Sequence, residues 1–206
     1  MDRERSLDRL ITFCDAVVAI AITLLGLPLV DLAAEFGKDG VDSVGELLTG
    51  NESRLFSFFL SFLVIAVLWM AHHRVYSRVH ASTPGLVWAN VLWLIPIVFL
   101  PFPTELLAVG DADDFGASAL YIGTLIAASL ALVLQVALLR RHPETHEDAP
   151  ISLVPSMVVT GIMVLSLVLV ALVPAVGMWP LALLAPVNLI SGRIRKQRAQ
   201  RAPASQ

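Results

Sequence analysis

Six long apolar stretches dominate the chain, and each approaches the length of a membrane span. They cover about 10–30, 55–73, 86–104, 115–139, 151–173 and 176–192. A helix needs roughly 20 mostly apolar residues to cross a bilayer, because it rises about 1.5 Å per residue. Apolar residues make up 57 % of the chain and charged residues only 15 %, which excludes an ordinary soluble domain. The pattern predicts an all-α integral membrane protein, with six transmembrane helices in a single domain over residues 1–206.

The first stretch has a second interpretation, because an Arg-flanked apolar segment near an N-terminus is typical of a cleaved signal peptide. The sequence "DLAAEF" after it offers small residues for cleavage. The apolar run is longer than the roughly 7–15 residues of a signal-peptide core, and it contains Asp15. Both features favour a membrane span.

Basic residues fall almost entirely on one side of the predicted membrane. With six spans and both termini inside, the inner segments hold twelve Lys and Arg residues: Arg3, Arg5, Arg9, Arg74, Arg78, Arg140, Arg141, Arg193, Arg195, Lys196, Arg198 and Arg201. The outer loops hold two, Lys38 and Arg54, beside ten acidic residues. Because Lys and Arg are retained on the cytoplasmic side, we expect a multi-pass protein of the cell membrane with both termini cytoplasmic. The tail 193–206 is more typical of an anchor to anionic lipid than of a nucleic-acid-binding arm.

Asp15 is a carboxylate inside the first apolar stretch, six residues after Arg9. On the second stretch His72 lies six residues before Arg78, and on the third Asn90 lies six residues after Pro84. These spacings place all three polar groups roughly 9 Å from the cytoplasmic boundary. A lone carboxylate in hydrocarbon costs at least ~2.5 kcal/mol, so we expect a polar network of Asp15, Asn90, Trp69 and His72 or His73. Such a network is either a clamp that fixes helix packing, the interpretation we favour, or a relay or ion site.

Other chemistry finds little support in the sequence. Cys14 is the single cysteine, so it cannot form an internal disulfide, and its apolar surroundings indicate a small core residue. The two histidines of "HPETH" (142–146) have a metal-ligand spacing without the usual order of a zinc motif. No two glycines lie two positions apart, which excludes dinucleotide-binding loops and the TVGYG potassium filter. We therefore expect neither an enzyme nor a resident cofactor.

These same stretches carry a family resemblance. "RLITFCD" followed by "AVVAIAITLLGLP" resembles the R-x-x-x-F-S-D signature and first helix of the transmembrane protein 175 family, the endosomal and lysosomal potassium channels and their prokaryotic relatives. "FLVIAVLWMAHHRVYSRV" and "NVLWLIPIVFLPFPTELL" are similar to that family as well. Arg9, Phe13 and Asp15 match the signature, whereas Cys14 stands where the family usually has Ser. Because a thiol is a poor hydrogen-bonding group, this departure weakens the expected clamp.

The resemblance implies a homotetramer of six-helix subunits whose first helices line a central pore. The family's pore positions then fall on Ile20, Thr23 and Leu27. These residues share one helical face, although from sequence alone such a stripe is more often lipid-facing or packed. Four Ile20 side chains would form an apolar collar, four Thr23 hydroxyls would contact a potassium ion on the pore axis, and Leu27 would form an outer collar beside Gly26 and Pro28.

The sequence therefore predicts a potassium-permeable channel whose partners are its own copies, the bilayer and monovalent cations. Its selectivity should be modest, and a single repeat favours a prokaryotic source. A proton channel or proton-coupled transporter, with Asp15, His72 and His73 as relay groups, is the alternative. A membrane scaffold without a pore remains a third class.

Overall fold

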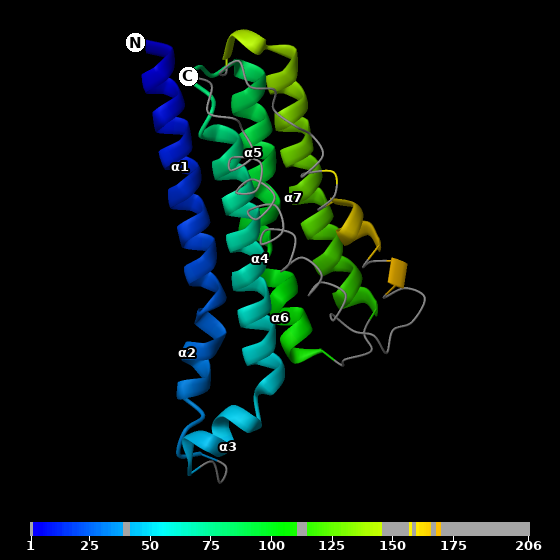
Figure 1. Cartoon of the computed structure of the whole chain (residues 1–206). Coiled ribbons are helices and arrows are strands. Elements are labelled where there is room, and N and C mark those ends of the chain that lie inside the picture. Colours follow the sequence, from blue (N-terminus) through cyan, green and yellow to red (C-terminus); the bar gives the residue numbers. More distant parts are fainter. Residues whose placement is uncertain are drawn as a thin grey trace, which may run out of the picture.

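Helices form almost all of the described chain. The computed structural model describes residues 2–38, 42–110 and 115–145, together with 157, 160–165 and 168–169. The long helical rods are α1 (Asp2–Leu25) with α2 (Leu27–Ala33), α4 (Glu52–Tyr76), α5 (Pro84–Phe99) with α6 (Pro101–Val109), and α7 (Phe115–Arg141). The short elements are α3 (Val44–Thr49) and the 3-10 helix η1 (Pro143–Thr145). Figure 1 shows the rods side by side. We call the end that holds the start of α1 the near end, and the end that holds α3 the far end.

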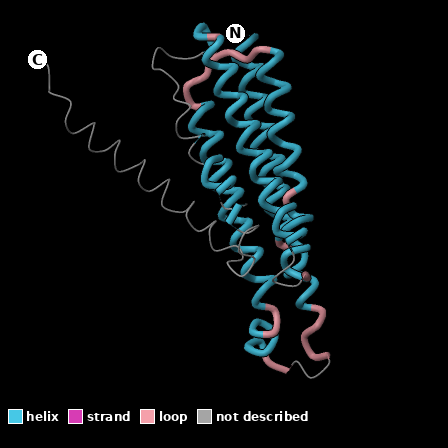
Figure 2. The backbone as a smooth tube through the Cα atoms, turned by 90° about the vertical axis from the view of Figure 1, so that its right-hand side faces the viewer, coloured by secondary structure: helices cyan, strands magenta, loops and turns pink. Residues whose placement is uncertain are grey.

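Four helical segments of the described chain are long and apolar enough to cross a membrane. They are Arg5–Ala33, Glu52–Tyr76, Pro84–Val109 and Phe115–Arg141. Each contains one of the first four spans expected from the sequence, and Figure 2 shows the rods packed as a bundle. The fifth expected span, 151–173, is described only at 157, 160–165 and 168–169, where it is helical. The sixth span, 176–192, and the basic tail, 193–206, lie outside the described residues.

Side-chain caps begin two of the helices. At α5, the Thr83 hydroxyl accepts the Leu86 N–H at 3.3 Å, and Pro84 occupies the first helical position, where no N–H is needed. At α3, the Ser43 hydroxyl accepts the Glu46 N–H and the Glu46 carboxylate accepts the Ser43 N–H, both at 3.1 Å. This capping box starts α3, the short helix that precedes α4.

Two of the rods are broken by proline or glycine. The first rod is interrupted at Gly26, between α1 and α2, where the Gly26 N–H donates to the Thr23 carbonyl at 3.0 Å. The third rod breaks at Leu100, which the expectation of one continuous span over 86–104 did not include. Pro101 and Pro103 have no N–H for the carbonyls of Ile97 and Phe99, so the α-helical ladder stops there and restarts as α6.

The core lies between α4, α5 and α7, and α1 covers one side of it. Trp93 and Tyr121 are the largest fully buried side chains, and Ile65 of α4 packs in the same cluster. From α1, Val18, Ala21 and Leu25 join that cluster. The first span is the least buried, with 22 % of its most apolar window inside the subunit, against 39, 44 and 56 % for the next three spans. The first rod is thus attached along one face only.

A buried hydroxyl group joins three helices in the far half of the bundle. Ser61 of α4 lies 2.8 Å from the Thr104 hydroxyl of α6 and 3.0 Å from the Tyr121 hydroxyl of α7. Ser61 and Tyr121 are fully buried. Because water is absent from the hydrocarbon core, these groups satisfy one another and fix the register of α4 against α6 and α7.

We expect a double-mutant cycle to detect this coupling. Ser61→Ala and Tyr121→Phe should each lower stability by about 0.6–1.7 kcal/mol, the range for hydrogen bonds between membrane helices. Since both variants remove the same bond, the double variant should lose less than the sum of the two losses. Thermal unfolding in detergent measures the effect, and strictly additive losses would contradict the shared bond.

Candidate functional site

The carboxylate of Asp15 is paired with an indole. Trp69 of α4 donates its Nε1–H to Asp15 Oδ1 at 2.8 Å, across the contact between α1 and α4. The Trp69 ring also contacts the exposed ring of His73 at a centroid distance of 5.6 Å. A hydrogen bond to an ionised acceptor is roughly twice as strong as a neutral one. Asp15 therefore attaches α1 to α4 at the level predicted from sequence.

A second polar group, the Asn90 cluster, lies behind this pair and comprises Cys14, His72, Tyr76 and Asn90. Asn90 is fully buried, and its Oδ1 lies 2.8 Å from His72 Nε2. Its Nδ2 donates to the Leu86 carbonyl at 2.9 Å and to the Tyr76 hydroxyl. Cys14 donates weakly to the same Oδ1, with its sulfur at 3.6 Å. One amide thus connects side chains of α1 and α4 to α5.

The orientation of the Asn90 amide also indicates which ring nitrogen of His72 carries the hydrogen. Because the carbonyl of Leu86 can only accept, the amide nitrogen faces it and the amide oxygen faces His72. His72 therefore donates from Nε2. Its ring lies in a stack, 4.4 Å from the Tyr76 ring and 4.3 Å from the Trp93 ring, measured between centroids. The imidazole is held on both faces and at one nitrogen.

The structure divides the expected network into two groups. Asp15 bonds to Trp69, whereas His72 bonds to Asn90, and in the described part of the chain no hydrogen bond joins Asp15 to either histidine or to Asn90. The two groups meet through adjacent residues of α1, Cys14 and Asp15. Arg9 and Phe13 lie on the exposed side of α1 instead, with Phe13 56 % exposed.

Sequence reasoning missed two polar members of this region. Tyr76 lies one helical turn after His72, so the spacing that selected His72 could have found it as well. Gln135 of α7 is fully buried and donates its amide to the Ala89 carbonyl at 3.1 Å. The feature of the sequence that could have identified Gln135 is a polar amide within the apolar stretch 115–139. Both residues extend the polar level around α5.

The three expected pore residues lie on the uncovered face of α1 and α2. Ile20 is 59 % exposed, Leu27 is 53 % exposed, and Thr23 is exposed between them. At 100° per residue this face points away from the core residues Val18 and Ala21. The Thr23 hydroxyl donates to the Ile20 carbonyl at 2.7 Å, which leaves the oxygen's lone pairs outward.

No metal centre is apparent where the structure can be described. Across those residues, no three His, Cys, Asp or Glu side chains gather as metal ligands. In the "HPETH" segment, Pro143–Thr145 form η1, and the Thr145 carbonyl accepts the His80 N–H at 2.9 Å. His146 lies outside the described residues. The described part of this segment connects the end of α7 to the loop between α4 and α5.

Known proteins match both the sequence and the fold. The family described as endosomal/lysosomal potassium channel TMEM175 matches residues 9–101. A potassium channel of Streptomyces collinus is 34 % identical over 60 % of this chain and 59 % of its own length, and one of Chamaesiphon minutus is 40 % identical over 48 % of each. The human endosomal/lysosomal proton channel TMEM175 is 28 % identical over 48 % of this chain and 19 % of its own length. The matches thus span about half the length of the bacterial relatives.

The fold agrees over a longer range. The crystal structure of a lysosomal potassium-selective channel TMEM175 homologue from Chamaesiphon minutus superposes with a TM-score of 0.71 and 26 % identity. The superposition covers 91 % of this chain and 98 % of the homologue's chain. The sequence and structure matches named here are all to proteins described as ion channels. The chain thus resembles the TMEM175 family in sequence over residues 9–101 and shares the fold of this homologue.

Substitutions at Asp15 should separate a packing role from an ion-binding role. Asp15→Asn keeps an acceptor for Trp69 and loses the charge-assisted part of the bond, whereas Asp15→Ala leaves a part-buried indole N–H unpaired at about 1–3 kcal/mol. We expect melting temperature in detergent to fall from wild type to Asn to Ala. Trp69→Phe added to Asp15→Ala should cost little more, since its partner is already absent.

Conductance measured on the same variants tests the alternative, in which Asp15 binds ions. An ion site at Asp15 would lose the same charge in both variants. Equal conductance losses with unchanged melting would therefore overturn the packing role.

Proposed function

We propose that this protein is a potassium-permeable cation channel of the cell membrane, formed by four copies around a pore lined by α1. The observation that carries the proposal is the uncovered face of the first rod. This is the least buried span, and its exposed face presents Ile20, Thr23 and Leu27 in line. The bacterial relatives are also named potassium channels.

A pore between subunits agrees with the interior of the single chain. The core between α4, α5 and α7 is filled by large apolar side chains such as Trp93, Ile122 and Leu125. The polar side chains Ser61 and Asn90 are bonded to neighbouring side chains rather than arranged along a continuous path. A hydrated route for an ion therefore fits the outer face of α1 better than the inside of one subunit.

The pore stripe supplies a barrier and a contact for a cation. Four Ile20 side chains at one level form an apolar collar, which can close by losing its water. Thr23 lies one turn further, and its hydroxyl oxygen can replace part of an ion's hydration shell because its hydrogen is already bound to the Ile20 carbonyl. Leu27 forms the outer collar. A side-chain ring offers few oxygens, so selectivity for potassium should be modest.

At the inner mouth we assign Arg9, Phe13, Cys14, Asp15, Trp69, His72, His73 and Asn90 to a clamp that holds the pore helix. Asp15 and Cys14 attach α1 to its own subunit through Trp69 and Asn90. Arg9 and Phe13 lie on the exposed face, where a neighbouring subunit would cover them. In this proposal the near end, which holds the start of α1, faces the cytoplasm, as the distribution of basic residues predicts.

Proton conduction is the second candidate, because the animal relatives are named proton channels. The titratable groups at the inner level, Asp15, His72 and His73, would serve as relays. Flux in liposomes distinguishes the two functions and the non-conducting scaffold. Potassium-driven uptake supports the channel, whereas uptake that follows only the proton gradient and falls in a His72→Gln/His73→Gln variant supports the proton path. Absence of any flux supports the scaffold.

A polar residue at the collar should open it. Ile20→Asn wets the constriction, so we expect higher conductance with weaker discrimination between ions. Ile95→Asn on α5 is the matched control, because Ile95 is 60 % exposed against 59 % for Ile20 and is not one of the proposed pore residues. Single-channel recording checks the result. Unchanged conductance with lowered expression in both variants would place Ile20 against lipid.

Removing the hydroxyl layer should reduce selectivity. Thr23→Ala takes away the four oxygens that contact the ion, so the preference for potassium over sodium should fall while the tetramer persists. Thr12→Ala is the control, since its hydroxyl also bonds its own helix, to the Asp8 carbonyl at 2.8 Å. Reversal potentials under mixed-ion conditions measure the ratio. A ratio that stays at the wild-type value would show that the filter lies elsewhere.

A further inference from the structure

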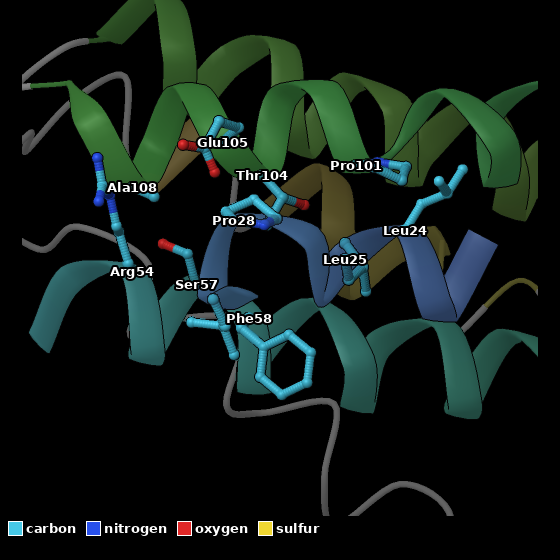
Figure 3. A pocket seen from close by; sticks show the side chains of 11 residues that line it. Leu24, Leu25, Pro28, Arg54, Ser57, Phe58, Pro101, Thr104, Glu105 and Ala108 are labelled. Carbon is cyan, nitrogen blue, oxygen red and sulfur yellow. The ribbon is translucent and has the colours of Figure 1, made fainter. Parts of the chain in front are cut away.

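A small cavity lies in the far half of the subunit, directly behind the break in the first rod. Its volume is about 20 Å³, and residues of α1 and α2, α4 and α6 line it. Figure 3 shows Pro28 of α2 beside the cavity, with Ser57 from α4 and Glu105 from α6 reaching toward the same space. The cavity thus adjoins both the interrupted backbone and polar side chains.

The break leaves the backbone short of a donor at this place. Pro28 has no N–H, so it cannot donate to the Leu24 carbonyl four residues before it. The neighbouring N–H groups bind elsewhere: Gly26 donates to the Thr23 carbonyl at 3.0 Å, and Leu29 donates to the Gly26 carbonyl at 3.2 Å. Leu24 and Pro28 both line the cavity. The residue whose carbonyl lost its ordinary helical donor therefore lines the cavity.

Ser57 supplies a second polar group without a protein partner. Its side chain is only 5 % exposed and lines the cavity. Among the described residues its hydroxyl forms no hydrogen bond, in contrast to Thr104 on the opposite wall, which is bonded to Ser61 and to the Leu100 carbonyl. A hydroxyl that lines such a space without a protein partner favours a polar occupant beside it.

The size and the chemistry of the cavity select water as the occupant. A cavity needs about 10–15 Å³ to hold one water molecule, and the molecule needs two to four polar partners. The Leu24 carbonyl accepts, the Ser57 hydroxyl donates or accepts, and the Glu105 carboxylate accepts. The guanidinium of Arg54 on the same wall disfavours a cation. We propose that this cavity binds a structural water molecule that replaces the hydrogen bond removed by Pro28.

The position of this water gives it a role in the pore helix, an extension that rests on the proposed function. Leu27 begins α2 on the other side of the same break and is 53 % exposed. A water bridge is more easily rearranged than a helical hydrogen bond. The cavity is then a solvated hinge, and a tilt of α2 about it moves the outer collar.

A single substitution distinguishes a wet cavity from a dry one by the sign of its effect. In a wet cavity, Ser57→Val removes a partner of the water and occupies its volume, so the melting temperature should fall by about 2–4 °C. In a dry cavity the added methyl groups gain contacts with Leu25 and Phe58, and the melting temperature should rise. Ser53→Val, one turn earlier on α4 and exposed, controls for the lower helix propensity of valine.

A Ser57→Val melting temperature equal to or above that of Ser53→Val overturns the proposal. A high-resolution structure of the wild-type protein provides a second test if the variant does not assemble. It should show an ordered water within about 2.7–3.2 Å of Ser57 Oγ and the Leu24 oxygen, and an empty cavity there overturns the proposal. Neither readout depends on conduction, so a failure of the channel assays leaves this test unaffected.

Discussion

The buried amide of Asn90 sets the relative positions of the helices at the near end. In hydrocarbon an amide can be satisfied only by other protein groups or by trapped water. Asn90 reaches His72 and Tyr76 on α4, the Leu86 carbonyl of its own helix, and more weakly Cys14 on α1. A slide of α4 by one turn would break two of these bonds at once. The register of α4 against α5 is therefore fixed by polar contacts, where apolar packing alone would tolerate small shifts.

The first rod is bonded to its subunit along one face only. Its opposite face therefore stays available for other contacts. Near its start, Asp15 bonds to Trp69, and in its middle the small side chain of Ala21 packs against the core. At the far end Glu35, just after α2, pairs with Arg54 of α4 at 3.3 Å. All of these contacts lie toward the subunit. The opposite face keeps its apolar side chains exposed over the length of the span, so it is available to lipid or to other copies of the chain.

The depth of the polar groups could be predicted from sequence, but their pairing could not. Counting residues from Arg9, Arg78 and Pro84 predicted one level for Asp15, His72 and Asn90, because every helix rises by the same amount per residue. The pairing of side chains depends on the rotation of each helix about its axis. Residue counting does not predict that rotation. The interruption at Leu100 was missed for another reason. Long apolar stretches hide the effect of prolines, although Pro101 and Pro103 remove two donors in succession.

Cys14 clarifies why a carboxylate is retained inside an apolar helix. The thiol lies 3.6 Å from the Asn90 oxygen, whereas His72 reaches the same oxygen at 2.8 Å. The bond that α1 contributes to the Asn90 cluster is thus its weakest, and the cluster stays satisfied mainly through α4 and α5. Packing of Val18 and Ala21 does not restrict sliding of α1 as strongly as a directional bond does. The charge-assisted bond from Trp69 to Asp15 then supplies most of the directional attachment of α1 to its subunit, which offsets the cost of placing a carboxylate in the membrane.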